Sequence, residues 1–413
     1  MSSRFAKTFA LFLPGIFLLG FNIGTGSVTA MAKAGADYGM SLLWTIAVSC
    51  VATFFMINAY GRYTLITDET ALQAFRAHIH PGVGLFFLIA LTAGVCGSVM
   101  GVMGIVAEIS SVWSQSFIAG GIAPVWFAAF FIALVYFIFW KGNTEFFERS
   151  LAVIVALMAA CFVLNLFILL PPPLEILQGL VPGLPDTPDK SPYLVIASMV
   201  GTTVFSGLFI IRTTLVKEAG WTLADSAQQR RDALVAVMMM FVISGSIMAA
   251  AAGTLHIEGL SLTSAAQMIG LLEPLAGSLA TTLFVIGIVA AGVSSQFPNV
   301  LLLPWLLCDF NQSERDMTLP RYRMIVFGIS LLGLVVPIFS ARPILVMIVS
   351  QAFNAVILPA TVACILYLGN RRDLLGEHVN TTVTNAVLGL ILAFSLFTSA
   401  LGIQGVWQLV NSL

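Results

Sequence analysis

Long runs of apolar residues follow one another along the chain, and only short polar connections separate them. A helix that crosses a membrane needs about 20 apolar residues, and most of these runs reach that length. The pattern predicts an all-α protein with about eleven membrane-spanning helices. Their approximate ranges are 9–34, 40–60, 83–107, 122–140, 150–170, 192–216, 232–254, 277–300, 322–340, 343–369 and 384–410. The longest connection, about 171–191, is rich in Pro and Gly, so we expect an irregular loop there.

Two of the apolar runs are interrupted by small and hydroxyl-bearing residues. The first run contains Gly24-Thr25-Gly26-Ser27, and the sixth contains Gly201-Thr-Thr-Val-Phe-Ser-Gly207. Irregular backbone survives at membrane depth only where it is buried in protein or lines a watery cavity. Broken helices of this kind hold the solute in many secondary transporters. Close packing of two helices through small residues is the alternative explanation of each glycine pair.

The positions of the two breaks predict how the chain is organised. With breaks in the first and sixth helices, helices one to five and six to ten form two repeats of opposite orientation, as in LeuT-type transporters. We therefore expect one transmembrane domain over residues 1–413. Repeat one covers about 9–170, repeat two about 192–369, and an extra helix about 384–410.

The composition fits a membrane protein and excludes several other classes. The chain has 413 residues, of which 59% are hydrophobic and 9% charged, whereas soluble domains carry about 25% charged residues. The net charge of −1 gives no reason to expect nucleic acid as a partner. The five cysteines form no metal-binding motif, and no phosphate-binding loop of an ATPase is present. We expect no cofactor and no enzymatic activity.

The basic residues predict the orientation in the membrane. Alternating loops place all Lys and Arg residues on one side, except Lys33, Lys190 and Arg342. Cytoplasmic loops carry the excess of Lys and Arg, so the N-terminus is expected in the cytoplasm and the C-terminus outside. The first apolar run has no small-residue cleavage site and should be retained. The expected location is a bacterial inner membrane, with the lipid bilayer as a partner.

Four stretches of the chain resemble the NRAMP family of metal-ion transporters. Leu13-Pro-Gly-Ile-Phe is similar to the family's GPGFL, and Ala71–Arg76 is similar to its LAQACR loop. Gly287–Ser295 resembles GLLAAGQSS, and Ser350–Pro359 resembles the family's SQ…LP signature. The resemblance covers nearly the whole chain. It implies the eleven-helix LeuT-type plan and the transport of divalent metal ions, with a coupling H⁺ or Na⁺.

The resemblance fails at the metal-binding motifs. The family's DPGN motif, whose Asp and Asn oxygens bind metal, falls on Gly24–Ser27. The Met of its A-x-x-M-P-H motif falls on Val204 or Phe205. Transition metals need imidazole, thiolate, thioether or carboxylate ligands, and these positions supply none. A small anion such as bicarbonate or a carboxylate, a zwitterion or a neutral solute is therefore the alternative to a metal ion.

The candidate solute-binding residues surround the two breaks. Half-helix N-termini offer free N–H groups and partial positive charge, which favours an anion. The candidate set comprises Asn22, Gly24, Thr25, Gly26, Ser27, Gly201, Thr202, Thr203, Val204, Phe205, Ser206, Gly207 and Gln351. No metal-binding residue is assigned.

Two charged residues near the ends of spans remain to be placed. Glu108 is either an interfacial acid or a group that couples transport to protons. Arg212 either extends to the cytoplasmic headgroups or faces an inner vestibule, where it would attract anions. The sequence as a whole predicts a secondary transporter that works by alternating access. A channel and a sensor that binds but does not transport are the alternative classes.

Overall fold

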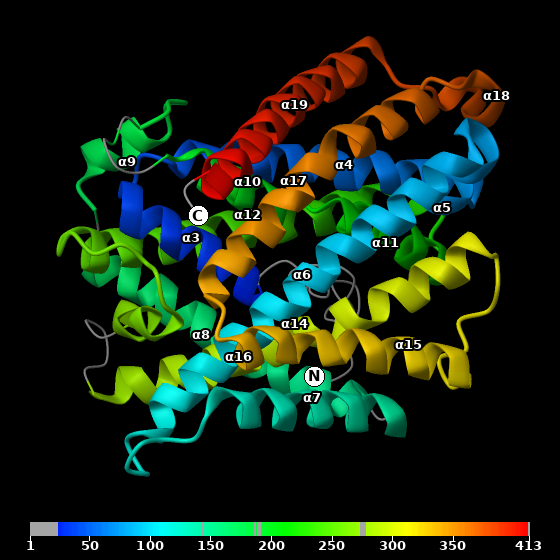
Figure 1. The fold of residues 1–413 in the computed structure, drawn as a ribbon. Helices are drawn as coiled ribbons and strands as arrows, with labels where there is room; N and C mark the ends of the chain where they lie inside the picture. Colours follow the sequence, from blue (N-terminus) through cyan, green and yellow to red (C-terminus); the bar gives the residue numbers. More distant parts are fainter. Residues whose placement is uncertain are drawn as a thin grey trace, which may run out of the picture.

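The computed structural model describes residues 24–142, 144–169, 171–185, 187, 191–272 and 278–411. Figure 1 shows long helices that run between two ends of the molecule, with α5 and α18 at one end and α9 at the other. The helices are α3 (Thr25–Tyr38), α4 (Leu43–Thr67), α5 (Ala71–Ala74), α6 (Pro81–Ser114), α7 (Pro124–Lys141), α8 (Thr144–Ile168), α9 (Pro173–Gly179), α10 (Tyr193–Thr203), α11 (Ser206–Glu218), α12 (Ser226–Ala251), α14 (Ser278–Phe310), α15 (Pro320–Leu331), α16 (Val335–Phe339), α17 (Pro343–Leu368), α18 (Arg372–Leu375) and α19 (Thr382–Asn411).

Short helical turns of other types join these elements. Two are π-helical, η1 (Phe75–Ile79) and η3 (Ala252–His256). The 3-10 turns are η2 (Leu223–Asp225), η4 (Ala265–Leu272), η5 (Leu332–Leu334) and η6 (Gly376–His378).

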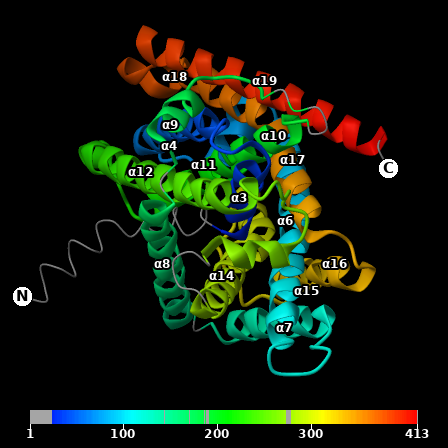
Figure 2. The same cartoon turned by 90° about the vertical axis from the view of Figure 1, so that its left-hand side faces the viewer.

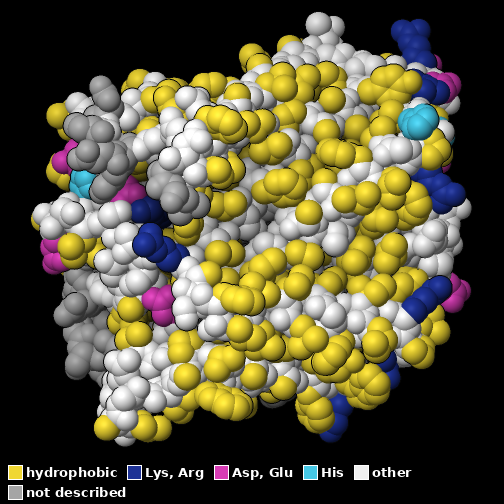
Figure 3. Space-filling model, viewed as in Figure 1, with side chains coloured by type: hydrophobic (Ala, Val, Ile, Leu, Met, Phe, Trp, Pro, Cys, Tyr) yellow, Lys and Arg dark blue, Asp and Glu magenta, His cyan; other side chains and the backbone are white. Residues whose placement is uncertain are grey.

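The prediction of an all-α polytopic membrane protein is confirmed. Within the described ranges, nine helices are long and apolar enough to cross a membrane, and Val155–Ile168 of α8 is a shorter apolar helix. The first half of the first predicted span lies outside the described residues. Lys and Arg side chains gather at the end where α5 and α18 lie, while the flanks between the two ends are mostly apolar (Figure 3).

Proline and glycine set many of the helix ends. Prolines at the first helical position start α6, α7, α15 and α17, because a proline there loses no helical hydrogen bond. Gly142 ends α7 with a positive φ of 69°, a conformation that glycine adopts without strain. Prolines also lie inside α14 and α17. Neighbouring helices satisfy the backbone groups that such prolines free.

Two details of the predicted elements were wrong, and one span has a local irregularity. The predicted span 277–300 continues to Phe310, because α14 runs through Pro298 and Pro304. The predicted span 322–340 is present as Pro320–Phe339, with a 3-10 turn, η5, inside it. The predicted irregular loop 171–191 contains α9, which starts at a proline and packs so closely that a Cβ on Gly179 would lie 2.2 Å from the Met40 carbonyl oxygen.

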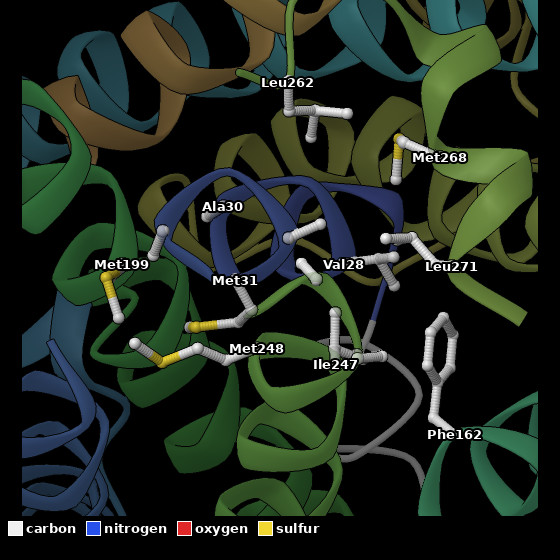
Figure 4. Close-up of a cluster of buried hydrophobic side chains, with 14 of the residues drawn as sticks. Val28, Ala30, Met31, Phe162, Met199, Ile247, Met248, Leu262, Met268 and Leu271 are labelled. Atoms are coloured by element: carbon white, nitrogen blue, oxygen red, sulfur yellow. The ribbon is translucent and has the colours of Figure 1, made fainter. Parts of the chain in front are cut away.

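Helix α3 lies at the centre of the molecule. All of its residues except Lys33 are buried, and α10, α12, α17, α6 and α14 surround it. Figure 4 shows the side chains of Met31, Met199 and Met248 meeting where α3, α10 and α12 converge. Methionine fills irregular gaps of this kind because its side chain is flexible. The start of α3 is therefore held deep inside the protein.

Candidate functional site

The start of α3 is a helix end in the interior. Its N-cap residue, Gly24, is extended, with φ −99° and ψ −175°, and no side chain of the described residues caps the helix there. The first backbone bond runs from the Val28 N–H to the Gly24 oxygen at 3.1 Å. The N–H groups of the first turn have no carbonyl partner within the helix, and they carry the positive end of the helix dipole. This end can therefore receive an electron-rich group.

The sixth predicted helix is broken as expected. α10 ends at Thr203 and α11 starts at Ser206, with Val204 and Phe205 in non-helical conformations between them. One freed carbonyl, that of Thr203, accepts a hydrogen bond from Thr53 Oγ1 at 2.9 Å. The break brings the negative end of α10 and the positive end of α11 to the same place.

A small pocket of about 50 Å³ lies between the two breaks. A buried water needs about 10–15 Å³ of such volume, so the pocket holds a few waters or a small solute. Its lining comes from α3, α6, α10, α14, α17 and the α10–α11 break. The lining residues are Gly24, Gly26, Ser27, Ser98, Val102, Thr202, Phe205, Ser295, Asn299, Gln351 and Asn354.

Neutral polar groups dominate the pocket wall. The Gln351 amide nitrogen donates to Ser98 Oγ at 3.2 Å and lies 3.4 Å from Met347 Sδ. The Asn354 amide nitrogen donates to Gln351 Oε1 at 3.3 Å. Asn354 Oδ1 is buried without a hydrogen-bond partner. These side chains are hydrogen-bond donors and acceptors without charge.

Glycine lets the walls approach each other closely. A Cβ on Gly24 would lie 2.1 Å from Ser295 Oγ, and a Cβ on Gly26 would lie 2.5 Å from the Gln351 amide nitrogen. Any side chain at either position would therefore displace a pocket residue. The sequence left close helix packing and a solute-binding site as alternative explanations of these glycines. In the structure both glycines pack closely against neighbouring residues and also line the pocket.

Six of the sequence-derived candidates line the pocket: Gly24, Gly26, Ser27, Thr202, Phe205 and Gln351. The other described candidates, Thr25, Gly201, Thr203, Val204, Ser206 and Gly207, are buried beside it. The Thr203 hydroxyl donates to the Met199 carbonyl at 2.7 Å, and Ser206 Oγ accepts from Thr361 at 2.7 Å. Asn22 lies outside the described residues. The binding role of every candidate stays a prediction.

The candidate set did not include four polar residues of the pocket wall: Ser98, Ser295, Asn299 and Asn354. Three of them belong to stretches with a visible signal, since Ser295 and Asn354 lie in the motifs that resemble the NRAMP family and Ser98 lies in a Gly- and Ser-rich run. Asn299 lies outside these stretches. Their convergence could not be read from the sequence, because it depends on how α6, α14 and α17 are rotated.

The two charged candidates lie away from the pocket wall. Arg212 is 0% exposed and donates to Asp232 of α12 at 2.8 Å, so it does not extend to the headgroups. Its guanidinium also faces the Trp221 ring, 5.2 Å from the centre. Glu108 accepts a hydrogen bond from the Ala265 N–H at 3.0 Å, and this contact ties α6 to the start of η4.

The described residues contain no group of three or more His, Cys, Asp or Glu side chains that could hold a metal ion. What they do contain is a bundle of membrane helices in which the buried start of α3 and the break between α10 and α11 flank a small polar pocket. This is the architecture of the LeuT-type secondary transporters.

Comparison with known proteins identifies the family. The sequence model described as natural resistance-associated macrophage protein-like matches residues 16–405. The chain belongs to this NRAMP family, as its motifs predicted. A divalent metal cation transporter, MntH, from Bradyrhizobium diazoefficiens is 23% identical over 376 residues, which cover 87% of this chain and 82% of that protein. An MntH from Granulibacter bethesdensis is 22% identical and covers 95% of this chain and 88% of its own.

Solved structures agree on the fold. A manganese transporter from Eremococcus coleocola superimposes with a TM-score of 0.74 at 16% identity, covering 97% of this chain and 87% of that one. The transporter Mhp1, in an inward-facing conformation, gives a TM-score of 0.59 at 16% identity, covering 95% and 87%. The LeuT-type fold that the two breaks predicted is confirmed.

Proposed function

We propose that this protein is a secondary transporter that carries a small solute across the membrane by alternating access. The solute binds in the pocket between the start of α3 and the α10–α11 break. The observation that carries this proposal is the coincidence of the pocket with the buried start of α3 and the break between α10 and α11. Freed backbone groups at such breaks bind solutes in transporters of this architecture.

We infer that the solute is a small anion, such as bicarbonate or a carboxylate. The N-terminal end of α3 lies at the pocket and contributes about half a positive charge. Phe205, which directly precedes α11, also lines the pocket. Hydroxyl and amide groups of Ser27, Thr202 and Gln351 can donate further hydrogen bonds. A dication would lack any carboxylate in the pocket wall, and burying an uncompensated charge is costly.

A divalent metal ion is the second candidate substrate. Relatives named divalent metal cation transporters favour it. One feature near the site also does so, because the thioether of Met347 lies beside Gln351. Asn354, whose amide nitrogen donates to Gln351, has a side-chain oxygen without a hydrogen-bond partner among the described residues. Sulfur and amide oxygen are groups that can bind a transition metal.

The same proposal includes the orientation of the protein in the membrane and the coupling of transport to an ion gradient. The end that carries α5 and α18 is taken as cytoplasmic, since basic residues gather there (Figure 3). A gradient of H⁺ or Na⁺ would drive uptake.

The test is uptake by purified protein in proteoliposomes. Labelled bicarbonate, acetate and Mn²⁺ are compared, with and without an inward H⁺ or Na⁺ gradient. Replacing Thr202 with Val removes a pocket hydroxyl, and the loss of one hydrogen bond to a charged solute should weaken binding about tenfold or more. Thr203→Val is the matched control, because that hydroxyl bonds its own helix. Saturable anion uptake that responds to Thr202→Val alone supports the proposal.

Other results would overturn it. Saturable Mn²⁺ uptake without anion uptake selects the second candidate. Conductance that does not saturate identifies a channel, and binding without flux identifies a sensor.

A further inference from the structure

An apolar groove of about 450 Å³ lies on the surface between α7 and α15. The two helices lie side by side in both views of the fold (Figures 1 and 2). The wall includes Ala133, Tyr136, Trp140, Phe327 and Leu331, and every lining residue is aliphatic or aromatic. Ligand pockets in proteins have volumes of about 300–1,000 Å³, so this groove is large enough for a ligand.

The groove exists because small residues of α7 face large ones of α15. Ala129 and Ala133 leave space on one wall. The Tyr136 ring of α7 and the Phe327 ring of α15 are 5.2 Å apart and bridge the two helices. The groove faces the bilayer, since Phe137 and Trp140 at its rim are exposed. An apolar chain can therefore enter it from the side.

Three basic residues cluster at one end of the groove, namely Lys141 at the end of α7 and Arg321 and Arg323 at the start of α15. The Arg323 guanidinium lies 4.0 Å from the centre of the Trp140 ring, and Lys141 Nζ lies 4.8 Å from that of Phe137. Such contacts hold cations against aromatic faces.

In the part of the chain that the structure describes, none of the three cations forms an ion pair with a carboxylate. Asp316, which accepts a hydrogen bond from Thr318, is near enough for its charge to act on Arg323. One nearby carboxylate against three cations leaves net positive charge at the mouth of the groove.

We propose that the groove binds one acyl chain of an anionic phospholipid and that Lys141, Arg321 and Arg323 hold its phosphate. Tyr and Trp are enriched at the depth of the lipid headgroups, and Tyr136 and Trp140 lie at the basic end of the groove. Basic pockets between membrane helices on the cytoplasmic side suit anionic headgroups. A two-fold contact with a second copy would instead bring the same cations together.

The test is native mass spectrometry of the purified full-length protein with dioleoylphosphatidylglycerol or dioleoylphosphatidylcholine. Each basic residue near an anionic headgroup contributes about fivefold. We therefore expect R321Q/R323Q to weaken phosphatidylglycerol binding by about tenfold or more and to leave phosphatidylcholine unchanged. The matched control is R230Q/R231Q, which removes two exposed arginines from α12 at the same end of the molecule.

A second, independent variant tests the groove itself. Ala133→Trp fills the space for the acyl chain and should abolish tight lipid binding. Leu390→Trp, at an exposed position of α19, should not. Equal binding of the two lipids, or equal effects of the two arginine pairs, would overturn the proposal. A dimer that only Ala133→Trp disrupts would also overturn it, because a second copy would then occupy the groove.

Discussion

Replacing Asp232 with Asn should destabilise the protein strongly, because it leaves Arg212 buried without a negative partner. The two residues are 0% and 2% exposed and 2.8 Å apart, and Arg212 Nε and Nη2 have no hydrogen-bond partner among the described residues. At an effective dielectric constant of about 20, the attraction at this distance is about 6 kcal/mol. Desolvation offsets much of that gain, but removing one member of a buried pair still costs about 3–5 kcal/mol.

The assay is thermal unfolding of the purified protein, followed by tryptophan fluorescence. At about 2 °C per kcal/mol, Asp232→Asn should lower the apparent melting temperature by about 6–10 °C. The control is Asp373→Asn, which breaks an exposed pair. There Arg371 donates to the carboxylate and lowers the pKa of Asp373 to about 2. Exposed ion pairs contribute little, so this control should melt as the wild type does.

A double variant separates charge from packing. Arg212→Met with Asp232→Leu replaces the pair with apolar side chains, and such exchanges are often neutral. We expect the double variant to regain most of the stability lost in Asp232→Asn. If Asp232→Asn melts within about 2 °C of the wild type, the reasoning about this buried pair is refuted.

Two further predictions concern the pocket and the connection at α5. Gly26→Ala should raise the uptake KM about tenfold, because the new methyl displaces Gln351 at a cost of about 1–3 kcal/mol. Gly245→Ala should leave uptake intact, because its new Cβ would lie 3.9 Å from Leu43 Cδ1, an ordinary packing distance. Thr70→Val should lower the free energy of unfolding by about 1–2 kcal/mol, since the hydroxyl caps α5 and donates to Asp309 at 2.6 Å. Thermal unfolding that shows no loss in Thr70→Val would contradict that assignment.

The sequence by itself determined the membrane class, most of the spans and both breaks. Apolar runs define spans because the bilayer leaves backbone groups no partner outside a helix. The small-residue run before Val28 and the stretch around Val204 were visible as local interruptions, and the structure has helix ends at both. The division into two inverted repeats and the extra helix stays a prediction.

The tertiary structure alone decided which residues face the pocket. Thr202 and Thr203 are neighbours of the same type, yet Thr202 lines the pocket and the Thr203 hydroxyl returns to its own helix. Successive residues on a helix point about 100° apart, and the rotation of α10 against its neighbours selects between them. Arg212 likewise met Asp232 only because α11 and α12 both pack against α4. Local sequence patterns specify where the helices form. The rotation of each helix and how deeply it is buried are set by contacts between segments that are distant in the chain.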